Sequence, residues 1–424
     1  MKEKTLDKHQ LRIGLFVMLD LPWMSHPFLT NSFKIRNQRQ LRILRQLDID
    51  QVRVDLDRSD IFSEDELGET VTLEATETSE ADEDPGSTLW AEKNERIRRL
   101  KQRRSRLNQC AKCYMQKVSL ARKLMSHLRS APAQAAEEAH ELVDGMVGEL
   151  IEDAETTVQL VNLKHQDENS YHHAINVSAL ALVLGRKLGL DEVQLRLLGQ
   201  GALFHDLGHL KIPTQILMKK GPLTEPERRF YEQHPRYGAE IARQIGTLPV
   251  GVIEIIAKHH EHLDGSGYPG GLRANDIGLL TRILTVVNRY DNLCNGFGGE
   301  RALSPHQAVS RMYSKERQCY DPKVLTTFIT NLGVYPPGTV VRLNDARIAV
   351  VISINADDLL KPNVLVYSEE IPAEEALVLD LTEEGIGIRE SLHRSELTEK
   401  QIEYLNLSDK LSYYFQGARG DLGR

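Results

Sequence analysis

The feature of this sequence that most constrains its fold is a set of histidines that continue the apolar faces of predicted helices. In the stretch NSYHHAINVSALALVLG, His173 stands in helical register with Val177, so a helix would turn its imidazole toward the core. In VGVIEIIAKHHEHLDG, His259 and His260 follow an apolar face in the same way. We therefore predict consecutive helices from about residue 165 to residue 332, packed around polar groups.

Two further stretches place metal-binding side chains on inward faces. In LLGQGALFHDLGHLKIP, apolar residues at steps of three and four lead to His205 and Asp206, at the buried end of a helix that stops near Gly208. In FYEQHPRYG, His234 stands directly before Pro235. Any one of these histidines alone is more often a core residue that hydrogen-bonds its neighbours. Several of them together with an aspartate are best satisfied by metal coordination.

The donor set indicates both the metal and the reaction. Imidazole and carboxylate donors, with no paired thiolate nearby, suit Fe, Mn, Ni, Co or Zn better than Ca or Mg. An aspartate directly after a ligand histidine can offer one oxygen to each of two metals. Two metals at roughly 3.5–4 Å activate a water and stabilise both sides of a phosphorus under in-line attack. The pattern therefore favours phosphoester hydrolysis at a dinuclear centre.

The rest of the chain divides by composition into segments around this helical region. Residues 59–92 contain no Lys or Arg and are rich in Asp and Glu, which is typical of a solvated linker. The stretches GTVVRLNDARIAVVISIN and NVLVYS have the pattern of β-strands. The predicted fold class is mainly α, a helical bundle with a small α/β module before it and a small β-rich extension after it. The predicted domains are an α/β module at 1–60, an acidic linker at 61–92, a helical connector at 93–162, the helical metal domain at 163–334, the β-rich extension at 335–410 and a tail at 411–424.

Charge and hydropathy exclude several classes of function. A net charge of -8 and a pI near 6.0 argue against nucleic-acid polymers as partners, because their binding needs basic faces. No apolar run approaches the roughly 20 residues of a membrane span, and the first residues have no apolar signal core. We therefore expect a cytoplasmic protein. The four cysteines are too few and too scattered for a disulfide framework.

The combined motif resembles a known family. HDLG at 205–208 and HHEHLDGSGYP at 259–269, with His173 before them and His234 between them, are similar to the HD-GYP branch of the HD phosphohydrolase superfamily. The likeness covers about residues 163–334. It implies a helical domain whose metal centre hydrolyses the bacterial second messenger cyclic di-GMP. The stretch GLFVMLDLPWMSHPF resembles a small uncharacterised domain that precedes HD-GYP in some bacterial proteins.

The resemblance implies a role for each matching position. The matching metal ligands are His173, His205, Asp206, His234, His259 and His260, with Asp206 as the bridge between metals, and Asn288 and Asp291 occupy a further D-x-x-D ligand motif. The residues expected to act on the substrate are Asp206, His209 and Lys211 in catalysis and Asp264, Gly265, Gly267, Tyr268 and Pro269 in the cleft wall. Glu261 is expected to orient a ligand imidazole.

Three positions depart from the family pattern. Asn288 stands where the first aspartate of D-x-x-D is usual, so we expect one metal to be held less tightly. His209 replaces the lysine of HD-x-G-K that contacts phosphate, with Lys211 close in sequence. Asn169 stands where trinuclear members carry a glutamate, so we expect two divalent metals rather than three, with Fe or Mn favoured over Ni, Co or Zn.

These departures leave alternative functions open. The same pocket would serve a receptor or scaffold that binds cyclic di-GMP without cleaving it, or that docks a diguanylate cyclase (GGDEF) domain on its Gly-Tyr-Pro surface. A third alternative is an HD hydrolase of another nucleotide. The oligomeric state is also open, with a homodimer among the alternatives.

Overall fold

The computed structural model separates the chain into two compact units. The first comprises Met1–Arg104 and Ser368–Leu377, and the second comprises Ser105–Tyr367 and Val378–Arg424. The described residues are 3–22, 25–28, 30–60, 85–152, 157–161, 169–219, 221–296, 301–355, 358–382, 385–407 and 411–416. Most of the predicted acidic linker, residues 61–84, lies outside them.

The first unit contains a small antiparallel sheet with a helix, as the predicted α/β module requires. Its strands, in the spatial order β1-β4-β2-β3, are β1 (Glu3–Asp7), β2 (Phe16–Met18), β3 (Ser32–Lys34) and β4 (Gln51–Asp55). Helix α1 (Gln38–Gln46) begins at Asn37, whose side chain accepts a hydrogen bond from the Gln40 backbone N–H. Leu41 and Leu44 of this helix pack with Val17 and Val54 in the core of the unit.

Two long helices follow the linker. Helix α3 (Pro85–His127) begins inside the segment predicted as linker, and proline is favoured at the first position of a helix because its missing N–H is not needed there. Helix α4 (Pro132–Glu152) follows after a short turn. Ion pairs join the two helices, with Lys117 Nζ 2.7 Å from Glu149 Oε1 and Lys123 Nζ 3.1 Å from Glu138 Oε1.

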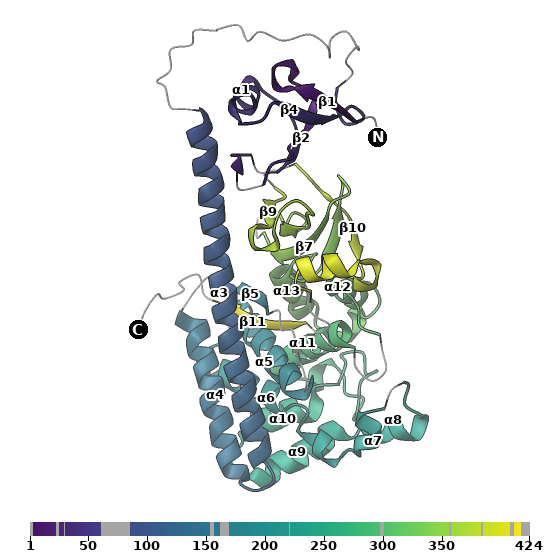
Figure 1. Ribbon diagram of the computed structural model, residues 1–424. Coiled ribbons are helices and arrows are strands. Elements are labelled where there is room, and N and C mark those ends of the chain that lie inside the picture. Colours follow the sequence, from purple (N-terminus) through teal and green to yellow (C-terminus); the bar gives the residue numbers. More distant parts are fainter. Residues whose placement is uncertain are drawn as a thin grey trace. The chain divides into compact units, whose positions relative to one another are not determined.

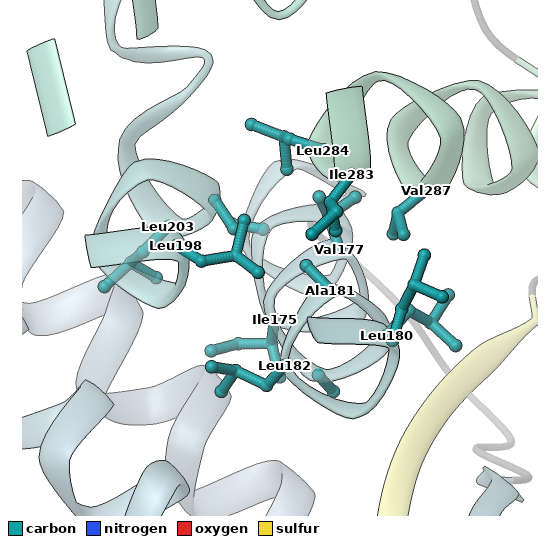
Figure 2. Packing of buried hydrophobic residues seen from close by; sticks show 14 of the residues in the cluster. Ile175, Val177, Leu180, Ala181, Leu182, Leu198, Leu203, Ile283, Leu284 and Val287 are labelled. Carbon is teal, nitrogen blue, oxygen red and sulfur yellow. The ribbon is translucent and has the colours of Figure 1, made fainter. Parts of the chain in front are cut away.

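The centre of the second unit is helix α5 (Asn169–Lys187), which lies among α4, α6 and α11 (Figure 1). Nearly every residue from Ala174 to Leu184 is buried, which is typical of a helix enclosed on all sides. Its neighbours are α6 (Glu192–Phe204) and α11 (Leu279–Asn295). Figure 2 shows Val177 and Leu180 of α5 close to Ile283 and Val287 of α11. This apolar core holds the N-terminal end of α5, which carries His173, in place.

Further helices surround this core, and all belong to the second unit. They are η3 (Leu207–Lys211), α7 (Thr214–Leu217), α8 (Glu225–Tyr231), α9 (His234–Ile245), α10 (Val250–Lys258), η4 (Ala274–Asp276), α12 (Pro305–Ser314), η5 (Arg317–Cys319) and α13 (Pro322–Leu332). The predicted bundle of consecutive helices is therefore confirmed. Within the described residues, no helix combines the length and the apolar character that a membrane crossing requires.

The predicted β-rich extension forms a sheet in the order β10-β6-β7-β8-β9. Its strands are β6 (Val340–Leu343), β7 (Ile348–Ser353), β8 (Asn363–Val366), β9 (Leu377–Asp380) and β10 (Ile388–Leu392), and helix α14 (Glu399–Tyr404) follows them. The mainly α fold class with small sheets near both termini is confirmed.

The segment predicted as a tail differs from the prediction. Residues Ser412–Gln416 form strand β11, which pairs antiparallel with β5 (Thr157–Val161) of the predicted helical connector. Tyr413, Tyr414 and Phe415 are buried in the core around α5. Three consecutive aromatic side chains have more to gain from burial than from exposure, which explains why the segment joins the fold.

Candidate metal centre

The histidines of the centre lie at the ends of helices, which direct them into one interior space. His173 is in the first turns of α5, His205 follows the last residue of α6, Asp206 precedes η3, His234 begins α9, and His259 and His260 follow α10. Helices η3 and α9 approach closely at Gly208, where an added Cβ would lie 1.8 Å from the carbonyl oxygen of His234. Glycine at this position therefore allows Asp206 to lie beside His234.

The carboxylate of Asp206 stands between two pairs of imidazoles. Its Oδ2 atom lies 3.3 Å from Nε2 of His205 and 3.7 Å from Nε2 of His173. Its Oδ1 atom lies 3.4 Å from Nε2 of His234 and 3.8 Å from Nε2 of His259. Each oxygen therefore belongs to a different donor group, and His260 completes the second group.

Backbone carbonyls determine which ring nitrogen of three histidines carries the proton. Nδ1 of His205 lies 2.7 Å from the Ala202 carbonyl oxygen, and Nδ1 of His259 lies 2.8 Å from that of Ile256. Nδ1 of His234 makes the same contact at 2.9 Å, to the carbonyl three residues before it. Because a carbonyl only accepts, each Nδ1 carries the hydrogen, and Nε2 of a neutral ring presents a lone pair to the centre.

These lone pairs face one another in pairs, and the donor set therefore fits cations. Nε2 of His234 lies 3.2 Å from Nε2 of His259, and Nε2 of His173 lies 3.0 Å from Nε2 of His205. Two nitrogens bound to one metal at about 2.1 Å lie about 3.0–3.4 Å apart in tetrahedral or octahedral geometry. Burial lowers the pKa of His234 to about 3, so its ring is neutral and able to coordinate.

Asp206 supplies negative charge between the two groups. Burial raises the pKa of this carboxyl, but the adjacent imidazoles of His205, His209 and His234, when they are protonated, outweigh burial and hold the pKa well below its usual value. The carboxylate is therefore ionised, as a bridge between two cations requires.

Asp291, the second residue of the N-x-x-D segment, lies on the outer side of His173. Oδ2 of Asp291 is 2.7 Å from Nδ1 of His173, which is the nitrogen that points away from His205. Asn288 also makes a side-chain hydrogen bond to His173, and its Oδ1 accepts from Asn292 at 2.9 Å. The structure thus places Asp291 where a carboxylate orients a ligand imidazole rather than among the inward-facing nitrogens.

A buried hydrogen-bond network behind Asp291 was missed by the sequence analysis. Asn176 donates to Oδ1 of Asp291 at 3.0 Å and accepts from the hydroxyl of Tyr114, on α3, at 3.0 Å. The backbone N–H of Tyr413, on β11, also donates to Asn176 at 3.1 Å. The only sequence signal was the spacing of Asn176 three residues after His173, because the other partners are distant in sequence.

Of the two residues expected to contact phosphate, the structure brings only His209 to the centre. Nδ1 of His209 lies 3.6 Å from Oδ2 of Asp206, and its Nε2 lies 3.2 Å from the hydroxyl of Tyr231. Lys211 instead pairs with Glu240 at 3.0 Å, at the surface. Tyr231 was not predicted.

The Gly-Tyr-Pro loop forms one wall of the centre. The ring of Tyr268 stacks on that of His260 with centroids 4.5 Å apart, and the backbone N–H of Tyr268 donates to the His260 carbonyl at 3.1 Å. At Gly267, an added Cβ would lie 2.4 Å from the His260 carbonyl oxygen, so only glycine fits. Gly265 and Pro269 lie in the same loop.

Glu261 holds this loop, and the expectation that it orients an imidazole was wrong. Its buried carboxylate accepts hydrogen bonds from the backbone N–H groups of Gly270, at 2.5 Å, and Leu272, at 2.8 Å. A buried carboxylate needs such donors, and here the loop backbone supplies them.

A second anchor holds η5 beside the loop. Glu316 receives hydrogen bonds from Arg289 and Arg311, both at 2.8 Å, and from the hydroxyl of Tyr320 at 2.8 Å. Burial raises the pKa of Glu316, but the hydrogen bond and charge of Arg289, together with Tyr320 and Arg311, lower it to about 2. Asp264 faces this side of the loop, where its Oδ1 accepts from Ser266.

Comparison with known proteins finds matches along most of the chain. The model of an HD domain matches residues 155–324, and a domain of unknown function matches residues 3–139. A cyclic di-GMP phosphodiesterase of Pseudomonas aeruginosa is 31% identical over 86% of this chain and 85% of its own length.

Two further relatives each match a smaller part of this chain. A cyclic di-GMP phosphodiesterase response regulator of Xanthomonas campestris is 31% identical over 39% of this chain and 44% of its own length. A 3′3′-cGAMP-specific phosphodiesterase of Vibrio cholerae is 29% identical over 39% of this chain and 35% of its own length. With the first relative aligned along most of both chains, the chain belongs to the HD-GYP family of HD-superfamily phosphohydrolases, of the cyclic di-GMP phosphodiesterase type, with a domain of unknown function before its HD domain.

Proposed function

We propose that this protein is a metal-dependent phosphodiesterase that hydrolyses cyclic di-GMP at the centre around Asp206. The observation that carries the proposal is the division of the Asp206 carboxylate, with one oxygen toward each pair of histidine nitrogens. The relative from Pseudomonas aeruginosa that aligns with 86% of this chain, a cyclic di-GMP phosphodiesterase, supports the choice of substrate.

The ligand residues form two metal sites that share Asp206. His173, His205 and Asp206 would hold one ion, and Asp206, His234, His259 and His260 would hold the other. Two bound divalent ions supply an activated water and neutralise charge on the phosphorus under attack. An imidazole-rich donor set with a bridging carboxylate favours Fe or Mn, with Ni, Co and Zn also compatible.

The remaining residues position the dinucleotide and its leaving group. Tyr268, stacked on His260, presents an aromatic edge at the wall of the centre, where a guanine or ribose can pack. His209 lies within reach of Asp206 and of the Tyr231 hydroxyl, so it can donate a hydrogen bond to a phosphate oxygen or hold a proton for the leaving oxygen. Asp291 orients His173 and is proposed to support the first site without binding the ion itself.

The test is turnover by the purified protein. Metal-free protein is loaded with Mn²⁺, or with Fe²⁺ without oxygen, and the loss of cyclic di-GMP and the appearance of linear dinucleotide or GMP are followed by chromatography. Wild type is expected to cleave the substrate, and His205→Ala and Asp206→Ala are expected to abolish cleavage. Tight binding without cleavage under all of these metals would refute the proposal and support a receptor.

A second cyclic dinucleotide, 3′3′-cGAMP, is the other candidate substrate, because one relative acts on it. The relative from Vibrio cholerae is specific for 3′3′-cGAMP, a cyclic dinucleotide that differs in one base. The same assay with both dinucleotides, alone and in competition, measures the preference as a ratio of kcat/KM. Docking of a GGDEF domain on the Gly-Tyr-Pro loop, homodimer formation and a cytoplasmic location stay predictions.

A further inference from the structure

A second cluster of metal-binding side chains is formed by the segment 262–264 and helix η5. His262 and Asp264 belong to the loop, and Cys319 is the last residue of η5. One donor atom of each residue lies within 4.8 Å of the other two. The backbone N–H of Leu263 donates to the Cys319 carbonyl oxygen at 2.9 Å, so the two segments are held side by side.

The side chains of this cluster are oriented toward one another. Asp264 Oδ1 accepts from the backbone N–H of Ser266 at 3.0 Å and from its hydroxyl at 2.7 Å. The Ser266 hydroxyl also lies 2.9 Å from Nδ1 of His262. Asp264 Oδ2 faces the sulfur of Cys319 at 3.8 Å, a distance at which a thiol is a weak hydrogen-bond donor. The Ser266 hydroxyl lies 4.0 Å from the same sulfur, so both of these contacts of the thiol are long and weak, and the two other metal-binding donors are close to it.

We propose that His262, Asp264 and Cys319 bind a further divalent ion of the zinc class, separate from the centre around Asp206. Thiolate, imidazole and carboxylate together are a donor set that zinc accepts, whereas Mg²⁺ and Ca²⁺ prefer oxygen alone. Three protein ligands leave a fourth position for water or for another ligand. The cluster differs chemically from the centre, since the two groups that share Asp206 contain no cysteine among the described residues.

The position of the site determines what a bound ion would do. It would join the loop that carries Tyr268 to η5, which the Glu316 network anchors to α11. A cross-link of this kind limits the movement of the loop relative to the helices. Ligand binding to the folded state also stabilises it by mass action, so the ion raises the unfolding temperature of the protein. The inference does not rest on the proposed reaction, because each of its readouts measures metal binding.

Cobalt(II) distinguishes this site from the dinuclear centre. Metal-free full-length protein is titrated with Co²⁺, and the near-ultraviolet thiolate-to-cobalt charge-transfer band is recorded, which only a cysteine ligand produces. We expect the amplitude of the band to saturate at the value for one thiolate-bound Co²⁺ per chain, and we expect the band to disappear when Zn²⁺ replaces Co²⁺. Cys319→Ser is expected to abolish the band and to lower the total bound metal by one equivalent.

Matched variants make the result decisive. Cys113→Ser changes a half-buried cysteine of α3 that lies outside the cluster, and it is expected to leave the band unchanged. His262→Gln and Asp264→Asn are expected to weaken Co²⁺ binding at this site at least tenfold, while the metal bound without a thiolate signal stays the same. Absence of the band in the wild type, or its survival in Cys319→Ser, would overturn the proposal.

Discussion

Replacement of Asp291 by asparagine tests how the first metal site is supported. The side chain is 1% exposed and its Oδ2 lies 2.7 Å from Nδ1 of His173, so Asp291→Asn retains the shape and removes the charge that orients this imidazole. Loss of such an outer partner lowers metal affinity by roughly 10–100-fold. At about 1.4 kcal/mol for each factor of ten, the expected loss is about 1.4–2.8 kcal/mol in the binding of one ion.

The assay is competition of the metal-free protein with a chromophoric chelator, which gives a separate affinity for each ion. We expect the affinity for the ion held by His173 and His205 to fall. The affinity for the ion held by His234, His259 and His260 is expected to stay the same. Tyr414→Phe is the control, because it also removes a side-chain hydrogen bond, the one that the Tyr414 hydroxyl donates to Glu149 at 2.7 Å, outside the Asp291 network. An equal fall in the affinity for both ions, or no change in either affinity, would refute the assignment of Asp291 to the first site. Loss of one whole equivalent would mean that Asp291 is itself a ligand.

Three further variants test other parts of the account. Gly208→Ala forces a Cβ against the His234 carbonyl oxygen, 1.8 Å away, and is expected to lower both the free energy of unfolding and the metal content. Gly148→Ala lies on the exposed face of α4 with nothing within 4 Å, and is expected to raise the free energy of unfolding by about 0.5–1 kcal/mol. The same change in the free energy of urea unfolding for both variants would contradict this. His209→Ala is expected to lower kcat by at least tenfold while Lys211→Ala changes it less than twofold, and the reverse order would show that Lys211 leaves Glu240 to reach the substrate. The pKa of Glu316 is about 2 in the folded protein and 4.5 in the unfolded chain, so its network stabilises the fold above pH 4.5, and this stabilisation is lost as the pH falls toward 2. At 1.36 kcal/mol per pKa unit, Glu316→Gln is expected to lower the free energy of unfolding by about 3 kcal/mol at pH 7 and by much less near pH 2.5. A loss of stability that does not depend on pH would contradict this role of Glu316.

The ligand histidines could be predicted because helical register is a local property. His173, His205 and His259 continue apolar faces, and a helix leaves little choice about where such a side chain points. The place of Asp206 directly after His205 made a dinuclear site possible, while its role as the bridge was implied by the family resemblance. The inward direction of the histidines was available from spacing alone, and the structure brings the predicted residues together.

Other features depend on contacts between distant segments, which spacing does not encode. Nothing in the N-x-x-D segment says whether Asp291 meets the inner or the outer nitrogen of His173, and the structure shows the outer one. Glu261 follows two ligands, yet its carboxylate turns to the loop backbone because that backbone offers two N–H donors. Strand β11 pairs with β5 from the far end of the chain, so its support of Asn176 required the fold to be known.

The central claim is that hydrolysis requires two ions bridged by Asp206. The most direct measurement is the rate of cyclic di-GMP cleavage as Mn²⁺ is added to metal-free protein, with bound metal measured at each step. We expect little turnover at the first equivalent, a steep rise with the second, and no turnover at any loading in Asp206→Ala. Full activity with a single equivalent, or cleavage by Asp206→Ala, would contradict the account.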